Sequence, residues 1–384
     1  MLTYSVKPRG GVVHALEVSE ALQRRGHRVE LMALARDDES LYRPPGVPLH
    51  VVRHDPPEAP FDERVQAMLE AYAQGLRPVL GAGGYDIVHS QDCLSANAAL
   101  ALRDDGVIAH VIRTVHHVDD FTSPSLVDCQ ERSIVGPDRV LCVSQPWVER
   151  LAEDFGRDAE IVRNGVDTNR FRPATSALDR DHDRERLGLG DRFAVLTVGG
   201  IEPRKGSLTL VRALAELRRL VPERDPLLLI AGGITLFDYR HEVEHFERLA
   251  RELGVTRHTR VLGAQPPKEI ERLYRAADAF AFPSVKEGFG LAALEALAAE
   301  LPVVASDLDV FRGFMTEGES ALLTPPGDAG ALARALAAVA VDGELRARLR
   351  AGGRDVAREY TWDAAAATHE RAYETFLATG ASVR

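Results

Sequence analysis

Short apolar runs alternate with amphipathic stretches along the whole chain. A bounded apolar run of roughly four to eight residues is typical of a strand in a buried parallel sheet. In the first half of the chain such runs predict strands at Arg28–Leu34, Leu49–Arg53, Asp86–Ser90, Ile108–Val115 and Val140–Ser144. In the second half they predict strands at Phe193–Val198, Leu227–Ala231, Arg260–Leu262, Ala279–Phe282 and Val303–Ser306. This alternation predicts an α/β fold made of open parallel sheets with helices on both faces.

The stretches between the strands repeat apolar residues at helical spacing. They predict helices at Val12–Arg25, Ser207–Leu220, Asp238–Leu253, Pro267–Ala277 and Phe289–Ala299, and consecutive helices with alanine-rich faces over Asp328–Leu377. A strand should also precede the glycine pair Gly10-Gly11, but only Met1–Ser5 is available for it. We therefore expect either that the first strand is short or that the chain begins late relative to its relatives.

A polar stretch separates the two sets of strands. It contains Pro173 and the charged run Asp179–Arg184 and has few apolar residues, which is typical of a domain boundary. We therefore expect an N-terminal domain, a linker, a C-terminal domain and a last helix that could return to the N-terminal domain. Their expected ranges are 1–166, 167–186, 187–360 and 361–384. Ligands of such sheets bind outside the carboxyl ends of the strands, so two facing domains would share one site in the cleft between them.

Composition narrows the class of protein. The chain has 384 residues and a formal net charge of −11, and this acidic balance argues against a nucleic-acid-binding protein. Its three cysteines, Cys93, Cys129 and Cys142, have no metal-ligand spacing, and an odd number argues against a disulfide framework. The longest apolar run, Leu227–Phe237, is too short to span a bilayer, and Met1–Lys7 does not resemble a signal peptide. We expect a soluble cytoplasmic protein, with peripheral contact to a membrane surface left open.

Two acidic residues frame the most informative motif, Pro283–Glu295. A predicted strand leads into a turn with Gly288 and Gly290, and a predicted helix follows. Glycines let a ligand approach the backbone closely, and a helix start presents free N–H groups and a positive dipole to an anion. Glu287 then lies just before the helix and Glu295 about two turns inside it. A capped surface helix after a glycine turn is the alternative interpretation of the motif alone.

The segment Gly199–Gly206 occupies the same kind of position, between a predicted strand and the helix Ser207–Leu220. It contains two adjacent cations, Arg204 and Lys205. Two cations at a strand-to-helix turn suit a diphosphate. A solvated charge pair on a loop is the alternative for these two residues taken alone.

The first half of the chain offers two weaker candidates. Arg9, Gly10 and Gly11 open the first long helix, so this turn could also hold an anion. His116 and His117 follow the fourth predicted strand, at the end where site residues of parallel sheets lie. Each histidine taken alone could equally be a hydrogen-bonded loop residue.

A zinc-binding pattern is also present. The segment His241–His245 reads H-E-x-x-H on a predicted helix, which could bind zinc with Glu242 as a base. The flanking residues are typical of an exposed amphipathic helix, and no third ligand is marked, although Glu269 and Glu271 stay open. We favour a surface helix and expect no metal site.

The order of these motifs resembles the retaining nucleotide-sugar glycosyltransferases of family 4, also called group 1, which have the GT-B fold of two Rossmann-like domains facing across a cleft. The resemblance runs from about Tyr4 to Asp328, and the acidic pair with Gly-Phe-Gly between its members is the most specific element. The matching positions are Gly10-Gly11, His116, Ser144, Asn164–Asp167, Gly199, Lys205-Gly206, Glu287–Glu295 and Pro325–Asp328.

The resemblance implies a role for the donor-side residues. Glu295 would bind the ribose hydroxyls of the nucleotide, Glu287 would contact hydroxyls of the donor sugar, and Lys205 would pair with the diphosphate. Backbone N–H groups of Phe289 and Gly290 would meet the phosphates, in a donor site that also includes Gly11, Gly199 and Gly288. His116 would face the donor sugar from the N-terminal domain, where Arg9, Gly10 and His117 would form the acceptor side.

Three positions depart from the family pattern. Gly200 stands where the family usually has an arginine, so we expect Arg204 to replace that cation beside Lys205. Glu300 stands where the family usually has a glycine, and Phe311–Phe314 lacks the glutamate of a usual Pro-Glu pair. These departures bear on the identity of the donor more than on the reaction class.

We therefore expect a retaining glycosyltransferase that moves a sugar from a nucleoside diphosphate sugar to an unidentified acceptor. His116, Lys205, Arg204 and Glu287 are the expected catalytic residues, and no metal or cofactor besides the donor substrate is expected. Two alternatives stay open. One is a nucleotide-sugar-binding protein that lacks transfer activity because of Gly200, and the other is a sugar-nucleotide epimerase of the same fold.

Overall fold

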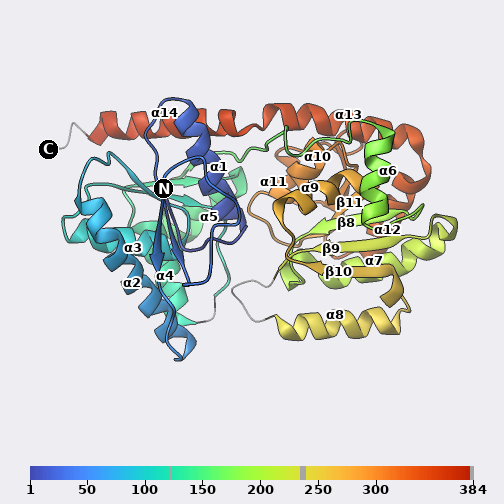
Figure 1. Cartoon of the computed structure of the whole chain (residues 1–384), viewed down its shortest axis with the longest axis horizontal. Helices are drawn as coiled ribbons and strands as arrows, with labels where there is room; N and C mark the ends of the chain where they lie inside the picture. The colour runs from blue at the N-terminus through green and yellow to red at the C-terminus, as the bar shows by residue number, and fades with distance from the viewer. Residues whose placement is uncertain (122, 234–238, 381–384) are drawn as a thin grey trace. The chain divides into compact units, whose positions relative to one another are not determined.

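The computed structural model describes residues 1–121, 123–233 and 239–380. It divides the chain into two compact units, each built on its own parallel sheet (Figure 1). The first unit comprises Met1–Asn164 and the C-terminal segment from Trp362, and the second comprises Gly165–Thr361. The chain therefore passes through the second unit and returns to the first. The first break falls two residues before the expected one.

The first unit contains a parallel sheet of seven strands among its described residues, in the order β3-β2-β1-β4-β5-β6-β7. The strands are β1 (Leu2–Thr3), β2 (Leu31–Ala35), β3 (Leu49–Arg53), β4 (Val88–Ser90), β5 (Val111–Val115), β6 (Arg139–Cys142) and β7 (Glu160–Ile161). The helices are α1 (Gly10–Arg24), α2 (Phe61–Gly81), α3 (Cys93–Asp104), α4 (Pro124–Val135), α5 (Gln145–Phe155) and α14 (Trp362–Gly380). One core packs β1, β2 and β4 against α2 and α3, and α14 packs along α1.

The second unit contains a six-stranded parallel sheet in its described residues, in the order β10-β9-β8-β11-β12-β13. The strands are β8 (Ala194–Val198), β9 (Leu227–Ala231), β10 (Thr259–Gly263), β11 (Ala279–Phe282), β12 (Val303–Ser306) and β13 (Ala321–Thr324). The α-helices are α6 (Ala177–Arg186), α7 (Ser207–Leu220), α8 (Arg240–Glu252), α9 (Pro267–Ala276), α10 (Leu291–Ala298), α11 (Asp309–Arg312), α12 (Ala329–Val341) and α13 (Gly343–Glu359). Three 3₁₀ turns complete it: η1 (Pro203–Lys205), η2 (Pro222–Arg224) and η3 (Thr256–His258).

Each sheet has one place where the strand order reverses direction. In the first unit this switch point lies between β1 and β4, and in the second it lies between β8 and β11. The connections at a switch point leave toward opposite faces of the sheet, which opens a crevice at the carboxyl ends of the two strands. The segments after these four strands are therefore where each unit can hold a ligand.

The predicted strands and helices are confirmed with small shifts at their ends. The first strand, β1, is as short as expected and covers Leu2–Thr3. Helix α8 begins at Arg240, and Asp238, the expected start, lies outside the described residues. Two short strands, β7 and β13, were not predicted. Within the described part of the chain, no helix has the length and apolar character needed to cross a membrane.

Residues 167–186, expected as a linker, belong to the second unit and contain α6. The charges that suggested a solvated stretch are paired inside the unit instead. Arg184 Nη1 lies 3.0 Å from Asp278 Oδ2, and Asp183 accepts Arg272 Nε at 2.9 Å and Arg275 Nε at 2.8 Å. Asp183 and Arg184 are both buried. These pairs fasten α6 to α9 and to the start of β11, so the linker expectation was wrong.

Glu300 follows α10 with a left-handed backbone, at φ +53°. The N–H of Glu300 bonds to Leu297 O at 3.0 Å and the N–H of Leu301 bonds to Ala296 O at 2.9 Å. This pair of bonds is the Schellman ending of a helix, in which glycine carries no steric cost. Glu300 therefore keeps the backbone shape that the family's glycine would adopt, but it adds a Cβ. The Glu300 carboxylate lies 3.3 Å from Arg354 Nη1.

The free energy of unfolding of the Glu300→Gly variant is expected to be about 1 kcal/mol higher than that of the Glu300→Ala variant. Both variants lose the carboxylate, and only glycine removes the Cβ from a left-handed residue. Urea unfolding of the two variants beside the parent protein measures this difference. Equal stability of the glycine and alanine variants would show that the backbone at Glu300 is not strained.

Candidate functional site

Two loops of the second unit meet at its switch point. One runs from Gly199 to Gly206 after β8, and the other runs from Pro283 to Gly290 after β11. Gly206 has φ +67°, and a Cβ built on it would lie 2.0 Å from Pro283 O. The N–H of Val285 also bonds to Arg204 O at 2.8 Å. Only glycine permits this close approach, which brings the two sequence motifs side by side.

The charged residues of the two loops form one cluster. Lys205 Nζ lies 2.5 Å from Glu287 Oε1, and Arg204 Nη1 lies 3.7 Å from the same oxygen. Ser284 Oγ donates to that oxygen at 2.9 Å. The Glu287 side chain is only 8% exposed. Burial alone would raise the pKa of Glu287, but the charges of Lys205 and Arg204 lower it overall, so the carboxylate is ionised and holds both cations.

Glu202 is a member of this cluster that the sequence did not single out. Its buried carboxylate lies 3.0 Å from Arg204 Nε. Its N–H bonds to Ser207 Oγ at 3.1 Å, which fixes the backbone of the η1 turn. In the sequence, its position directly before Pro203 is the feature that could have pointed to Glu202. Arg204 is therefore held between two carboxylates rather than extended into solvent.

Helix α10 begins at Leu291, two residues after the expected start at Phe289. Gly290 has φ +104°, which is incompatible with a helical residue, and a Cβ built on it would lie 2.6 Å from Phe311 Cε1. The Phe289 ring stacks on Phe314 with centroids 4.9 Å apart. Phe289 therefore contributes packing through its side chain. Backbone N–H groups at the start of α10 remain the groups suited to an anion.

Glu295 lies in the second turn of α10, closer to the helix start than the two turns expected. Its Oε2 accepts a hydrogen bond from Tyr274 Oη at 2.8 Å. Tyr274 comes from α9 and is 1% exposed. Nothing in the spacing from 274 to 295 indicates that the two residues meet, so the sequence alone does not point to this tyrosine.

The remaining predicted residues of the second unit lie on the same two loops. Gly199, at the end of β8, has φ +148°, and a Cβ built on it would lie 3.4 Å from Lys205 Cε. The aliphatic part of Lys205 thus passes over this glycine. Gly288 follows Glu287 directly. The donor-side residues predicted in this half of the chain are therefore assembled at one end of one sheet.

The first unit brings Gly11 and His116 together at its own switch point. A Cβ built on Gly11 would lie 3.3 Å from His116 Cδ2 and 3.5 Å from Gln91 O. Gln91, which follows β4, also pairs its Oε1 with His116 Nε2 at 2.9 Å. Burial, followed by the nearby His14 ring, lowers the pKa of His116 well below its ordinary value. The imidazole is therefore neutral near pH 7 and can exchange hydrogen bonds with a ligand.

The three predicted acceptor-side residues lie beside this group with separate contacts. Gly10 is the exposed first residue of α1. Arg9 bonds to the Tyr4 hydroxyl and lies over its ring, 5.3 Å from the centroid. His117 is exposed, with Nε2 3.2 Å from Asp119 Oδ2. Of the two adjacent histidines, only His116 is packed against the glycine turn.

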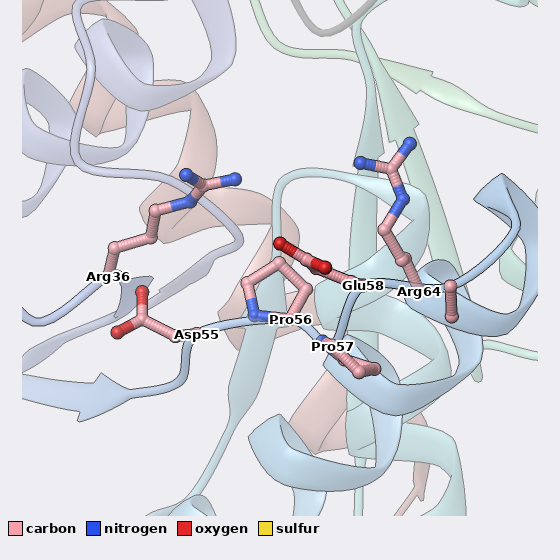
Figure 2. Close-up of a pocket in the computed structure, with 7 residues that line it drawn as sticks. Arg36, Asp55, Pro56, Pro57, Glu58 and Arg64 are labelled. Carbon is pink, nitrogen blue, oxygen red and sulfur yellow. The ribbon is translucent and has the colours of Figure 1, made fainter.

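A cavity of about 390 Å³ lies elsewhere in the first unit, beyond the ends of β2 and β3. None of the predicted site residues lines it. Arg36 and Arg64 flank the cavity from opposite sides, with Glu58 between them (Figure 2). The complete lining is Arg36, Asp55, Pro56, Pro57, Glu58, Ala59 and Arg64. Its mixed charges suit a polar ligand rather than an apolar one.

The H-E-x-x-H segment lies on α8, where the His241 side chain is fully exposed. Among the described residues, no group of three or more histidine, cysteine, aspartate or glutamate side chains is placed to hold a metal ion. The arrangement on α8 matches the surface helix that its flanking residues suggest.

Comparison with known proteins identifies the family. Residues 8–170 match the family model Glycosyltransferase Family 4, and residues 179–356 match Glycosyl transferases group 1. A D-inositol 3-phosphate glycosyltransferase of Corynebacterium jeikeium is 30% identical over 394 residues, which cover 97% of this chain and 93% of the relative. This chain belongs to the group 1 glycosyltransferases.

Further comparisons also cover nearly the whole of this glycosyltransferase, and the solved structures among them show its fold. A D-inositol 3-phosphate glycosyltransferase of Xylanimonas cellulosilytica is 34% identical, covering 93% of this chain and 90% of the relative. Sucrose-phosphate synthase of Thermosynechococcus elongatus superposes with a TM-score of 0.80 at 23% identity, over 97% of this chain and 94% of that one. Anabaena HepE in complex with UDP and glucose gives 0.78 at 20% identity, over 97% of both chains. The fold is GT-B.

Gly200 of this glycosyltransferase stands where a larger residue would meet its neighbours. A Cβ built on it would lie 2.8 Å from Gly233 O and 3.1 Å from Glu202 Oε1. An arginine at this position would require the backbone after β9 to shift. The glycine at position 200 therefore leaves room for the buried Glu202 side chain. Arg204 is the cation next to Lys205.

Proposed function

We propose that this glycosyltransferase transfers its sugar with retention of the anomeric configuration and that Lys205 and Arg204 stabilise the departing nucleoside diphosphate. The observation that carries the proposal is the convergence of both cations on one oxygen of Glu287 at the β8–β11 switch point. Transfer of a sugar leaves negative charge on a phosphate oxygen. Cations that are already in place stabilise such charge without reorganisation during the reaction.

The other residues take complementary parts in this proposal. Glu287 keeps Lys205 and Arg204 in place before the donor binds and can accept hydrogen bonds from donor-sugar hydroxyls. Backbone N–H groups at the start of α10 add further donors for the diphosphate. His116, neutral and packed beside Gly11, is suited to hydrogen-bond the sugar. Because Lys205, Arg204 and the N–H groups at the start of α10 can together meet the diphosphate charge, we infer that transfer needs no bound metal.

Three outcomes separate this proposal from its alternatives when the protein is incubated with UDP-, ADP- and GDP-sugars and a candidate acceptor that can receive the sugar. Release of the diphosphate, with a product that keeps the donor's anomeric configuration by NMR, supports retaining transfer. Conversion of the donor to an epimer without release supports the epimerase. Binding without either reaction supports a nucleotide-sugar-binding protein.

Three unpaired cysteines fit a reducing compartment, so we propose that the protein works in the cytoplasm.

The first acceptor to test is D-inositol 3-phosphate, the acceptor that the names of the two bacterial relatives give. We propose that an anionic acceptor binds beside Arg9, Gly10 and His117 in the first unit, because a guanidinium group binds phosphate through paired N–H groups. Diphosphate release with D-inositol 3-phosphate, and not with unphosphorylated inositol, would support this choice.

The variant Glu295→Gln is expected to bind the nucleoside diphosphate about 10- to 100-fold more weakly while keeping its fold. The expected role of Glu295 is to accept hydrogen bonds from the ribose, and bonds to a charged group contribute about 1.5–3 kcal/mol. Calorimetry with UDP, ADP and GDP measures the affinity. The variant Glu247→Gln, on the exposed surface of α8, is the matched control and should bind like the parent protein. Unchanged affinity of Glu295→Gln would remove the nucleotide anchor from the proposal.

A further inference from the structure

The Tyr274 hydroxyl lies between two acceptors on α10. Tyr274 Oη is 2.8 Å from Glu295 Oε2 and 3.0 Å from Ala292 O. A phenol has one hydrogen to donate, and an ionised carboxylate is a stronger acceptor than a neutral carbonyl. The hydrogen bond to Glu295 is therefore the one that the hydroxyl favours.

The ring that carries this hydroxyl cannot turn away. Tyr274 is 1% exposed and is packed between Phe171 and Phe280, with ring centroids 5.5 and 5.7 Å away. Burial, followed by the charge of Glu295, raises the pKa of Tyr274 well above its ordinary value, so the phenol stays protonated and remains a donor. A rigid donor at this place fixes one oxygen of the Glu295 carboxylate.

A glutamate on a helix surface otherwise samples several rotamers, and ordering it on ligand binding costs conformational entropy. An anchor on one carboxylate oxygen removes part of that cost in advance. The Glu295 side chain is partly exposed, whereas Tyr274 is inaccessible to a ligand. Any effect of Tyr274 on nucleotide binding must therefore pass through the residues it touches.

We propose that Tyr274 is a positioning residue that holds the Glu295 carboxylate in the orientation that accepts the ribose hydroxyls of the nucleotide. The inference rests on the proposed role of Glu295 and adds the residue that prepares it. A tyrosine that served only the packing of α9 against α10 would affect stability and not the recognition of the ribose.

The test uses Tyr274→Phe, which keeps the ring and removes only the hydroxyl. Calorimetry compares the binding of UDP with that of 2′,3′-dideoxy-UDP, which lacks both ribose hydroxyls, and ADP or GDP with its dideoxy analogue replaces UDP if that base binds more tightly. We expect Tyr274→Phe to weaken UDP binding by roughly three- to tenfold, the size of one hydrogen bond. Binding of the dideoxy analogue should be unchanged, and Tyr274→Phe should add no further loss in the Glu295→Gln background.

The matched control is Tyr72→Phe, another buried tyrosine, whose hydroxyl bonds to Thr3 O and Met32 O in the first unit. It should bind UDP like the parent protein, and thermal unfolding of each variant reports any loss of fold. Equal losses for UDP and its dideoxy analogue, or none for UDP, would overturn the positioning role while Glu295→Gln still weakens binding. If Glu295→Gln itself leaves the affinity unchanged, the proposed role of Glu295 fails, and the inference about Tyr274 fails with it.

Discussion

Replacing Lys205 by alanine is expected to lower kcat/KM by about 10²–10³. Removal of one preorganised donor to a developing negative charge typically costs this much, or roughly 2.7–4 kcal/mol. Lys205 is 17% exposed and lies against the carboxylate of Glu287 and over the Phe282 ring, so its ammonium group is held in place. Solvent cannot fully replace a charge at so enclosed a position.

Arg204→Ala should also lower kcat/KM. Gly200 has no side chain that could supply the family's usual cation, and we propose that Arg204 supplies it instead. The double variant is expected to lose less than the product of the two single losses, since both cations contact Glu287 and act on the same charge. Steady-state kinetics with the donor identified by diphosphate release measures all three variants. Lys268→Ala, on the exposed face of α9, is the matched control.

Two further measurements separate a catalytic loss from a structural one. Each variant leaves Glu287 with one cation fewer, so its thermal unfolding must be compared with that of the parent protein. Lys205→Arg keeps the charge and should recover part of the activity. If Arg204→Ala retains full activity while Lys205→Ala does not, Arg204 is a partner of Glu202 alone, and the proposed replacement for the family arginine is wrong.

Moving from pH 7 to pH 5 is expected to lower the free energy of unfolding of the first unit by at least about 3 kcal/mol. His14, His89, His116 and His369 form one network, in which His14 Nε2 is 3.3 Å from His369 Nε2 and the His14 and His116 rings are 4.8 Å apart. Burial, followed by the neighbouring His369, lowers the pKa of His14 to about 3. Burial also lowers the pKa of His369 to about 4.

The sign follows from which state binds protons. Below about pH 6.5 the unfolded chain protonates these histidines while the folded chain keeps them neutral, so stability falls with pH until the folded pKa values are reached. At pH 5 each of His14 and His369 contributes a loss of about 2 kcal/mol. Burial raises the pKa of Asp92 to about 6, so this carboxyl binds its proton in the folded state first and offsets about 1 kcal/mol. His89 and His116, whose pKa values are also lowered by burial, add to this loss.

Urea unfolding at pH 7, 6 and 5 tests this prediction. His369→Gln keeps a polar side chain without a titrating ring and should make stability depend less on pH over this range. His241→Gln, which alters the fully exposed histidine of α8, should follow the parent protein. Stability that stays level from pH 7 to pH 5 would mean that the network already carries protons in the folded state.

The sequence determined the fold class and the two chemical motifs of the second unit. Apolar runs bounded by turns mark buried strands, because a strand covered on both faces must be apolar throughout. The glycines that let the loops after β8 and β11 approach each other can also be recognised in the sequence. Arg204, Lys205, Glu287 and Glu295 could therefore be named in advance from strand, turn and helix order.

What the sequence left open depended on contacts between residues far apart in the chain. The charges of α6 looked like those of a solvated linker until Asp183 and Arg184 met partners about ninety residues later. The short strand β7 carries no apolar run of its own and exists because it pairs with β6. Charge composition and local periodicity cannot distinguish a solvated residue from one whose partner comes from another helix.

Tertiary structure also decided which groups prepare the site. Tyr274 reaches Glu295 because α9 and α10 pack together, and Glu202 lies beside Arg204 because the η1 turn folds back on Ser207. The helix after the glycine turn begins at Leu291 because Gly290 has a left-handed backbone, at a place where a Cβ would meet Phe311. Sequence motifs name the residues that touch a ligand, whereas their orientation is set by buried partners that only the packed structure brings within hydrogen-bond distance.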